Sequence, residues 1–167
     1  MTEWWLLCEQ HTLVLDAAAG ALPSALADQA SAAGWDAADW AERIAPARWG
    51  HAAEQDPWVL RQRALSLASA VTRRTAPCRH TAAHDAAVPV VVLARAPGVS
   101  ACPVCAETTV ARTTTAGHMC DRCHQVPVGL DDRTALLVGQ ALILVAQLCE
   151  GCATAALDSF RLPQDGA

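Results

Sequence analysis

Residues 100–126 read SACPVCAETTVARTTTAGHMCDRCHQV and contain two Cys-x-x-Cys pairs. The pairs are Cys102 with Cys105 and Cys120 with Cys123, and residues 106–119 separate them. Four thiolates at this spacing can converge as a tetrahedron, which is the geometry that Zn²⁺ prefers in a closed structural site. We therefore predict that these four cysteines bind one Zn²⁺. Two disulfides or free core thiols are the alternative, which a reducing compartment disfavours.

Residues 100–126 resemble a zinc ribbon, a family in which two such knuckles lie on the turns of small β-hairpins. The resemblance implies a strand or hairpin arm over Glu107–Thr115, between the knuckles, and the threonine-rich composition also suits a strand. A valine-rich run at Val88–Ala94 ends at Pro97-Gly98. This run predicts another strand that enters a turn.

The segments on either side of the ribbon carry helix signals. Asp56-Pro57 reads as an N-cap followed by the first residue of a helix over 57–74. An apolar run after Asp131 and Asp132 predicts a long buried helix. The other predicted helices cover about 23–34, 37–45 and 153–160, and the long one covers about 133–148.

These signals predict a mainly α protein with a small β zinc ribbon, an α+β fold closed by structural metal sites. The predicted helical body comprises residues 1–84 and 131–167. The strand and the zinc-ribbon module occupy residues 85–130.

Two further half-sites lie near the ends of the chain. Cys8 and His11 form one, and Cys149 and Cys152 form the other. We predict that they combine into one Cys₃His site, which gives two Zn²⁺ per chain. Closing the longer loop costs only about 2 kcal/mol more by the logarithmic loop law, whereas structural zinc contributes about 10–16 kcal/mol. The alternative is that Cys8 and Cys149 are buried thiols and that His11 is a surface histidine.

A third group of metal-ligand residues consists of Cys78, His80 and His84. The two histidines would share one face of a helix and could hold a metal with Cys78 or Asp85, with His118 or His124 as completing ligands. A solvated loop with an incidental thiol is one alternative. In another, Cys78 and His80 replace the Cys8 half-site as partners of Cys149 and Cys152. A metalloenzyme at this group is a distant alternative, because no HExxH arrangement accompanies it.

The chain has 167 residues, a net charge of −5 and no lysine. Residues 57–84 contain arginines and no acidic residue, and two more arginines lie in the ribbon. The arginines concerned are Arg61, Arg63, Arg73, Arg74, Arg79, Arg112 and Arg122. Such a segment either pairs with acidic side chains of the same chain or contacts a phosphate backbone. The net negative charge favours internal pairing, because nonspecific DNA binding is mostly electrostatic.

A second resemblance is carried by the Cys8/His11 pair that runs into Leu22–Asp28, by the tryptophan-bearing helical middle and by the ribbon. This layout is similar to small zinc-binding proteins of actinobacteria and their phages. That resemblance implies a C-terminal helix-turn-helix and DNA binding. In this chain residues 136–160 carry another Cys-x-x-Cys in place of a polar recognition helix.

The predicted function is that of a non-enzymatic structural-zinc adaptor or regulator that docks onto a protein partner in nucleic-acid machinery or a phage assembly. A zinc-ribbon protein that binds nucleic acid through the arginines named above is the alternative. The N-terminus lacks a secretory signal and no apolar run is long enough to span a bilayer. We therefore predict a cytoplasmic protein without a membrane partner.

Overall fold

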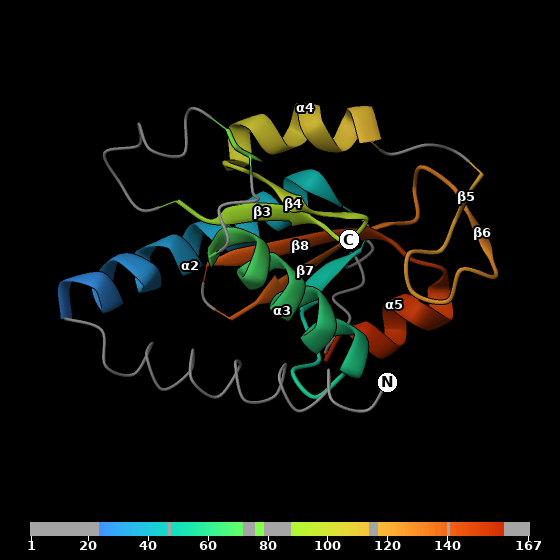
Figure 1. Ribbon diagram of the computed structural model, residues 1–167, viewed down its shortest axis with the longest axis horizontal. Helices are drawn as coiled ribbons and strands as arrows, with labels where there is room; N and C mark the ends of the chain where they lie inside the picture. Colours follow the sequence, from blue (N-terminus) through green and yellow to red (C-terminus); the bar gives the residue numbers. More distant parts are fainter. Residues whose placement is uncertain are drawn as a thin grey trace, which may run out of the picture.

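The computed structural model describes residues 24–46, 48–71, 76–78, 88–113, 117–139 and 141–158. These residues form a six-stranded mixed sheet with helices on both faces, and a separate two-stranded sheet lies beyond one end (Figure 1). The strand order of the large sheet is β1-β7-β8-β3-β4-β2. The predicted fold class, mainly α with a small ribbon, is therefore wrong, because the described chain is mixed α/β.

The helices are α2 (Ser24–Ile44), α3 (Pro57–Val71), α4 (Pro103–Thr113) and α5 (Glu150–Ala156). The strands of the large sheet are β1 (Trp49–His51), β2 (Ala76–Pro77), β3 (Val90–Leu93), β4 (Ala96–Ala101), β7 (Arg133–Val138) and β8 (Leu142–Gln147). The small sheet pairs β5 (His118–Met119) with β6 (Pro127–Val128). Within the large sheet, β3 pairs antiparallel with β4 and β7 with β8, while the β1–β7, β3–β8 and β2–β4 pairs are parallel.

The apolar segment 133–148, predicted as one buried helix, forms the central hairpin β7–β8. Five consecutive residues in each strand are buried, Thr134–Val138 and Ile143–Gln147. A strand covered on both faces reads as a continuous apolar run, and such a run cannot be told from a buried helix by periodicity. The prediction was wrong because helices cover both faces of the sheet, which makes both strands apolar throughout and hides the alternation typical of a strand.

The predicted ribbon arm over 107–115 is also wrong, because most of this segment belongs to α4. Pro103 occupies the first helical position, where its missing N–H costs nothing. The hydroxyl groups of Thr109 and Thr113 donate to the carbonyls of Cys105 and Thr109, at 2.9 and 2.8 Å. Ala106 and Val110 are buried on the side that packs against the sheet. Packing and these bonds override the strand preference of threonine.

Two other local predictions, a helix and a strand, are confirmed. The helix at Asp56-Pro57 is confirmed as α3, and Oδ1 of Asp56 accepts the N–H groups of Trp58 and Val59 at 2.9 and 3.1 Å. The valine-rich strand is confirmed as β3, but Pro97 and Gly98 lie inside β4 instead of in a turn. The two helices predicted over 23–34 and 37–45 are one helix, α2, and α5 begins at Glu150.

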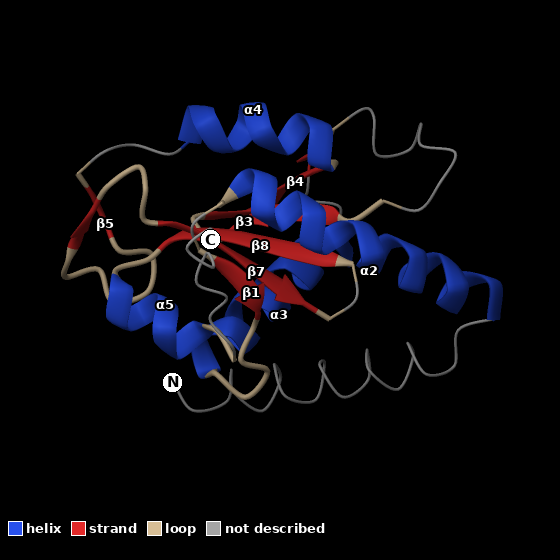
Figure 2. Cartoon of the chain, turned by 180° about the vertical axis from the view of Figure 1, so that it is seen from behind, coloured by secondary structure: helices blue, strands red, loops and turns tan. Residues whose placement is uncertain are grey.

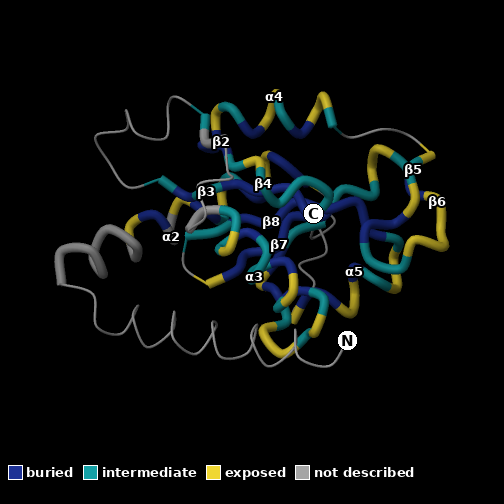
Figure 3. The backbone as a smooth tube through the Cα atoms, in the orientation of Figure 1, coloured by how far each residue is buried: buried dark blue, intermediate teal, exposed yellow. Residues whose placement is uncertain are grey.

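The core consists of two apolar layers on opposite faces of the sheet (Figures 2 and 3). One layer joins Ala41 and Ile44 of α2 and Val110 of α4 to the sheet. The other joins Val59 of α3 and Ala153 of α5 to it. None of the helices in the described ranges is long and apolar enough to cross a membrane.

Two glycines of similar surroundings should respond oppositely to alanine. Gly139, which follows β7, has a φ of 62°, whereas Gly151 lies in α5, and a Cβ would meet no atom within 4 Å at either position. Gly139→Ala should lower the free energy of unfolding by about 1–2 kcal/mol, because L-residues are strained at positive φ. Gly151→Ala should raise it by up to about 1 kcal/mol. Urea denaturation measures both, and equal effects would contradict the prediction.

Candidate metal centres

Four cysteines converge at the end of the sheet where α5 begins. They are Cys120, Cys123, Cys149 and Cys152, and we call them the Cys₄ cluster. Their Sγ atoms all lie within 4.8 Å of one another, and the Sγ atoms of Cys123 and Cys149 are 4.0 Å apart. A tetrahedral zinc site with Zn–S bonds of about 2.3 Å places its sulfurs about 3.8 Å apart. The Cys₄ cluster is therefore consistent with a closed zinc site.

The Cys₄ cluster joins a tight turn to the start of a helix. Cys120 and Cys123 lie in the connection between β5 and β6, while Cys149 follows β8 at the N-cap of α5. The N–H of Cys149 donates to Sγ of Cys120 at 3.4 Å. His124 has a φ of 56°, a left-handed conformation that histidine tolerates better than most residues and that completes the turn. The turn between β5 and β6 and the start of α5 thus bring their four thiols together in one cluster.

The residue that follows Cys120 anchors the turn to the sheet. The Asp121 side chain is 5% exposed, and its Oδ2 accepts the N–H of Gln147 at 2.7 Å and lies 3.5 Å from Nη2 of Arg95. Its Oδ1 lies 3.2 Å from Nε2 of His118. Arg95 also donates to the Gln147 side chain and to the carbonyl of Thr113. This buried network supports the cluster as outer-shell groups support metal ligands.

The next residue, Arg122, anchors the same turn to α3. Its Nη2 donates to Oδ2 of Asp56 at 2.7 Å, and its Nη1 donates to the carbonyl of Cys152 at 3.4 Å. Asp56 is also the N-cap of α3. Asp121 and Arg122, the two residues between Cys120 and Cys123, therefore connect the Cys₄ cluster to β8 and to the start of α3.

The thiols of the Cys₄ cluster differ in acidity. The backbone N–H groups of Gln125 and Val126 stabilise the thiolate of Cys123 and lower its pKa to about 6. Burial, together with the neighbouring thiols, raises the pKa of Cys152. Adjacent thiolates repel one another, whereas a bound dication makes all of them deprotonate. Such a set of donors suits a thiophilic metal ion.

A second cluster lies where β2 and β4 end. It consists of Cys78, Cys102 and Cys105, whose Sγ atoms are all within 4.8 Å of one another, and we call it the Cys₃ cluster. Cys102 precedes α4 and Cys105 lies in its first turn. The N–H of Cys102 donates to Sγ of Cys78 at 3.2 Å. Burial, with contributions from the other two thiols, raises the pKa of Cys105 to about 11.

The structure groups the cysteines differently from the sequence analysis. The predicted set of Cys102, Cys105, Cys120 and Cys123 is divided between the two clusters. Cys149 and Cys152 join Cys120 and Cys123. Cys78 lies with Cys102 and Cys105, so the alternative in which Cys78 joins Cys149 and Cys152 is wrong as well.

Of the remaining predicted ligands, Cys8, His11, His80 and His84 lie outside the described residues. The two described ones, His118 and His124, enter neither cluster. His118 contacts Asp121 instead, and His124 is exposed. The sequence analysis missed Asp121, Arg95 and Gln147, for which no motif gave a signal.

The described arginines favour internal pairing over a basic face. Ion pairs join Arg122 to Asp56, Arg48 to Asp132 and Arg95 to Asp121. Arg61 and Arg112 are exposed and Arg63 is half-buried. Arg73, Arg74 and Arg79 lie outside the described residues.

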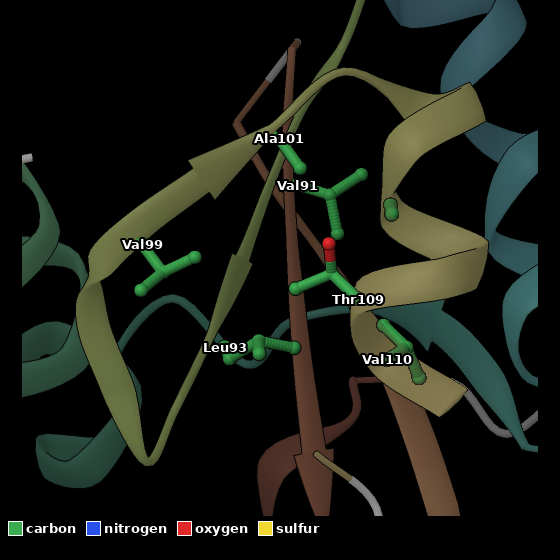
Figure 4. Close-up of a pocket in the computed structure, with 7 residues that line it drawn as sticks. Val91, Leu93, Val99, Ala101, Thr109 and Val110 are labelled. Atoms are coloured by element: carbon green, nitrogen blue, oxygen red, sulfur yellow. The ribbon is translucent and has the colours of Figure 1, made fainter. Parts of the chain in front are cut away.

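A small hollow lies between the β3–β4 hairpin and α4 (Figure 4). It has no room for even a water-sized molecule, so it is not a small-molecule pocket. Its lining is apolar apart from Thr109 and includes Val91, Val99 and Val110. The hollow therefore offers no titratable group for catalysis.

The chain matches no protein-family model, no curated protein and no solved structure. The two cysteine clusters are consistent with zinc sites, which is the part of the zinc-ribbon resemblance that the structure supports.

Proposed function

We propose that this chain is a non-enzymatic structural-zinc adaptor that docks onto a protein partner. The observation that carries the proposal is that the four thiols of the Cys₄ cluster converge from two separate segments. One of the four residues, Cys120, is fully buried in the core. A zinc ion with four protein thiolates has no open position for water or substrate, and such sites contribute folding energy. The ion would stabilise a surface rather than carry out a reaction.

The surface in question is the segment 117–130, which includes β5 and β6 and lies beyond one end of the large sheet (Figure 1). Met119, Val126 and Leu130 of this segment are 37%, 44% and 49% exposed. Contiguous patches of exposed apolar side chains mark protein interfaces, in which methionine is enriched, and we infer that these three side chains form such a patch. Because Cys120 and Cys123 belong to the same segment, a bound metal would fix the docking residues on the body.

The nucleic-acid alternative has less support within the described ranges. Arg122, which it requires at the ribbon, is engaged by Asp56 at 2.7 Å. A phosphate backbone would have to compete with this ion pair.

Metal content and binding together test the proposal. Native mass spectrometry of the purified full chain should show bound zinc that is retained at neutral pH. Cross-linking in a lysate of the source cells should capture a protein that also binds the chain when both are purified. The variant Met119→Asp with Val126→Asp should lose that complex by at least tenfold in affinity. Val99→Asp, whose native side chain is similarly exposed at 37%, should retain it.

Two outcomes would contradict the proposal. Equal binding by the double variant and by Val99→Asp would exclude the segment 117–130 as the docking surface. A submicromolar duplex complex that weakens steeply with salt, and is lost in Arg73→Ala with Arg74→Ala, would establish the nucleic-acid alternative instead.

A further inference from the structure

The Cys₄ and Cys₃ clusters occupy equivalent places in two similar units. Each unit has an antiparallel hairpin, a Cys-x-x-Cys-Ala sequence at the end of the second strand, and a helix that starts there. The first unit comprises β3, β4, Cys102–Ala106 and α4, and the second comprises β7, β8, Cys149–Ala153 and α5. In each unit a further cysteine comes from the chain before the hairpin, Cys78 in the first and Cys120 in the second.

The same hydrogen bonds recur in both units. The N–H of Cys102 donates to Sγ of Cys78 at 3.2 Å, and the N–H of Cys149 donates to Sγ of Cys120 at 3.4 Å. In each helix the N–H of the alanine donates to the carbonyl of the first cysteine at 2.9 Å. Both alanines, Ala106 and Ala153, are buried against the sheet. The equivalence therefore extends to the thiol geometry.

The two units point in opposite directions on one sheet. Strand β3 is parallel to β8 and antiparallel to β4, so β4 and β8 end at opposite ends of the sheet. Helices α4 and α5 pack against opposite faces. Figure 1 shows α4 starting at the left end and α5 at the right end. The two clusters are thus separate centres and do not share ligands.

We propose that the Cys₃ cluster binds a second Zn²⁺ and that this ion exchanges faster than the ion of the Cys₄ cluster. Binding releases the thiol protons and forms one Zn–S bond to each of the three cysteines. The position of Cys78 makes its release faster, because Cys78 follows β2, a two-residue strand at the sheet edge. The Cys₄ cluster, in contrast, is held by the Asp121 and Arg122 contacts. The inference extends the structural-zinc role proposed above.

Chelator competition on the zinc-loaded full chain tests the inference. Excess 4-(2-pyridylazo)resorcinol should remove zinc in two phases of one equivalent each, with rates that differ at least tenfold. Cys102→Ser should abolish the fast phase and leave the slow one. Cys149→Ser, its counterpart in the second unit, should abolish the slow phase.

Alkylation of the unmodified protein gives the same answer without a variant. Iodoacetamide added during chelation should label Cys78, Cys102 and Cys105 with the fast phase, as read by peptide mass spectrometry. One equivalent of zinc, with these three thiols labelled before chelator is added, would overturn the second centre and leave the proposed function standing. Labelling of the Cys₄ cysteines in the fast phase would overturn the order of exchange. Absence of any zinc would contradict the proposed function as well.

Discussion

Replacing Cys120 by serine is expected to destabilise the whole described body, with a loss of at least several kcal/mol from the free energy of unfolding. The Cys120 side chain is 0% exposed and belongs to the same apolar cluster as Leu136, Leu144 and Leu148. Loss of a structural zinc removes an apparent binding energy of about 10–16 kcal/mol, whereas a whole domain has about 5–15 kcal/mol of stability. Far-UV circular dichroism during thermal unfolding, with the variant and the native chain both purified in the presence of zinc, measures the effect.

Val126→Ser is the matched control for Cys120→Ser. Val126 lies in the same turn but is 44% exposed, so its replacement should change stability by less than about 0.5 kcal/mol. A Cys120→Ser protein that keeps the melting temperature of the native chain and loses structure only in β5 and β6 would contradict the prediction.

The second large effect is expected at Asp121. Asp121→Ala removes the acceptor of the Gln147 N–H and the carboxylate beside Arg95. Breaking a buried ion pair by deleting one partner costs about 3–5 kcal/mol, because the other charge stays buried without compensation. Arg95 is 22% exposed, so solvent screening places the expected loss near the lower end, at about 3 kcal/mol. Urea denaturation of the zinc-loaded protein measures it.

Two further variants locate the cause of that loss. Asp121→Asn keeps an acceptor for the Gln147 N–H but not the charge, so it should lose less than Asp121→Ala. Asp131→Ala, at an exposed aspartate ten residues along the chain, should change stability by less than about 0.5 kcal/mol. If Asp121→Ala behaved like Asp131→Ala, the network would not support the metal turn.

Local signals in the sequence predicted α3 and β3 correctly. An aspartate and a proline at the start of a helix, or a run of valines, act within a few residues of chain. The same holds for the cysteine pairs, because Cys-x-x-Cys spacing fixes a local half-site. The partner of each half-site depends on which strands become neighbours. The sheet places Cys149 beside Cys120 and Cys78 beside Cys102, and no local pattern contains that information.

The buried network shows a second limit of local patterns. Asp121, Gln147 and Arg95 come from three segments and meet only after β7 and β8 have folded against β3. In the sequence none of the three belongs to a motif that indicates a polar network. Gln147 lies within the segment 133–148 that was predicted as a helix, but in the structure it is 1% exposed and its side chain donates to the carbonyl of Gly129.

The parallel pairing of β3 with β8 has a consequence for synthesis of the chain. Residues 90–93 pair with residues 142–145, so the inner edge of β3 has no strand partner until the ribosome has made about fifty further residues. At about 5–20 residues per second this delay is on the order of 3–10 s. An apolar strand with an open edge is prone to aggregate during that time. Nascent chains that stop before residue 142 should therefore depend on chaperones, and completion of β8 should release them.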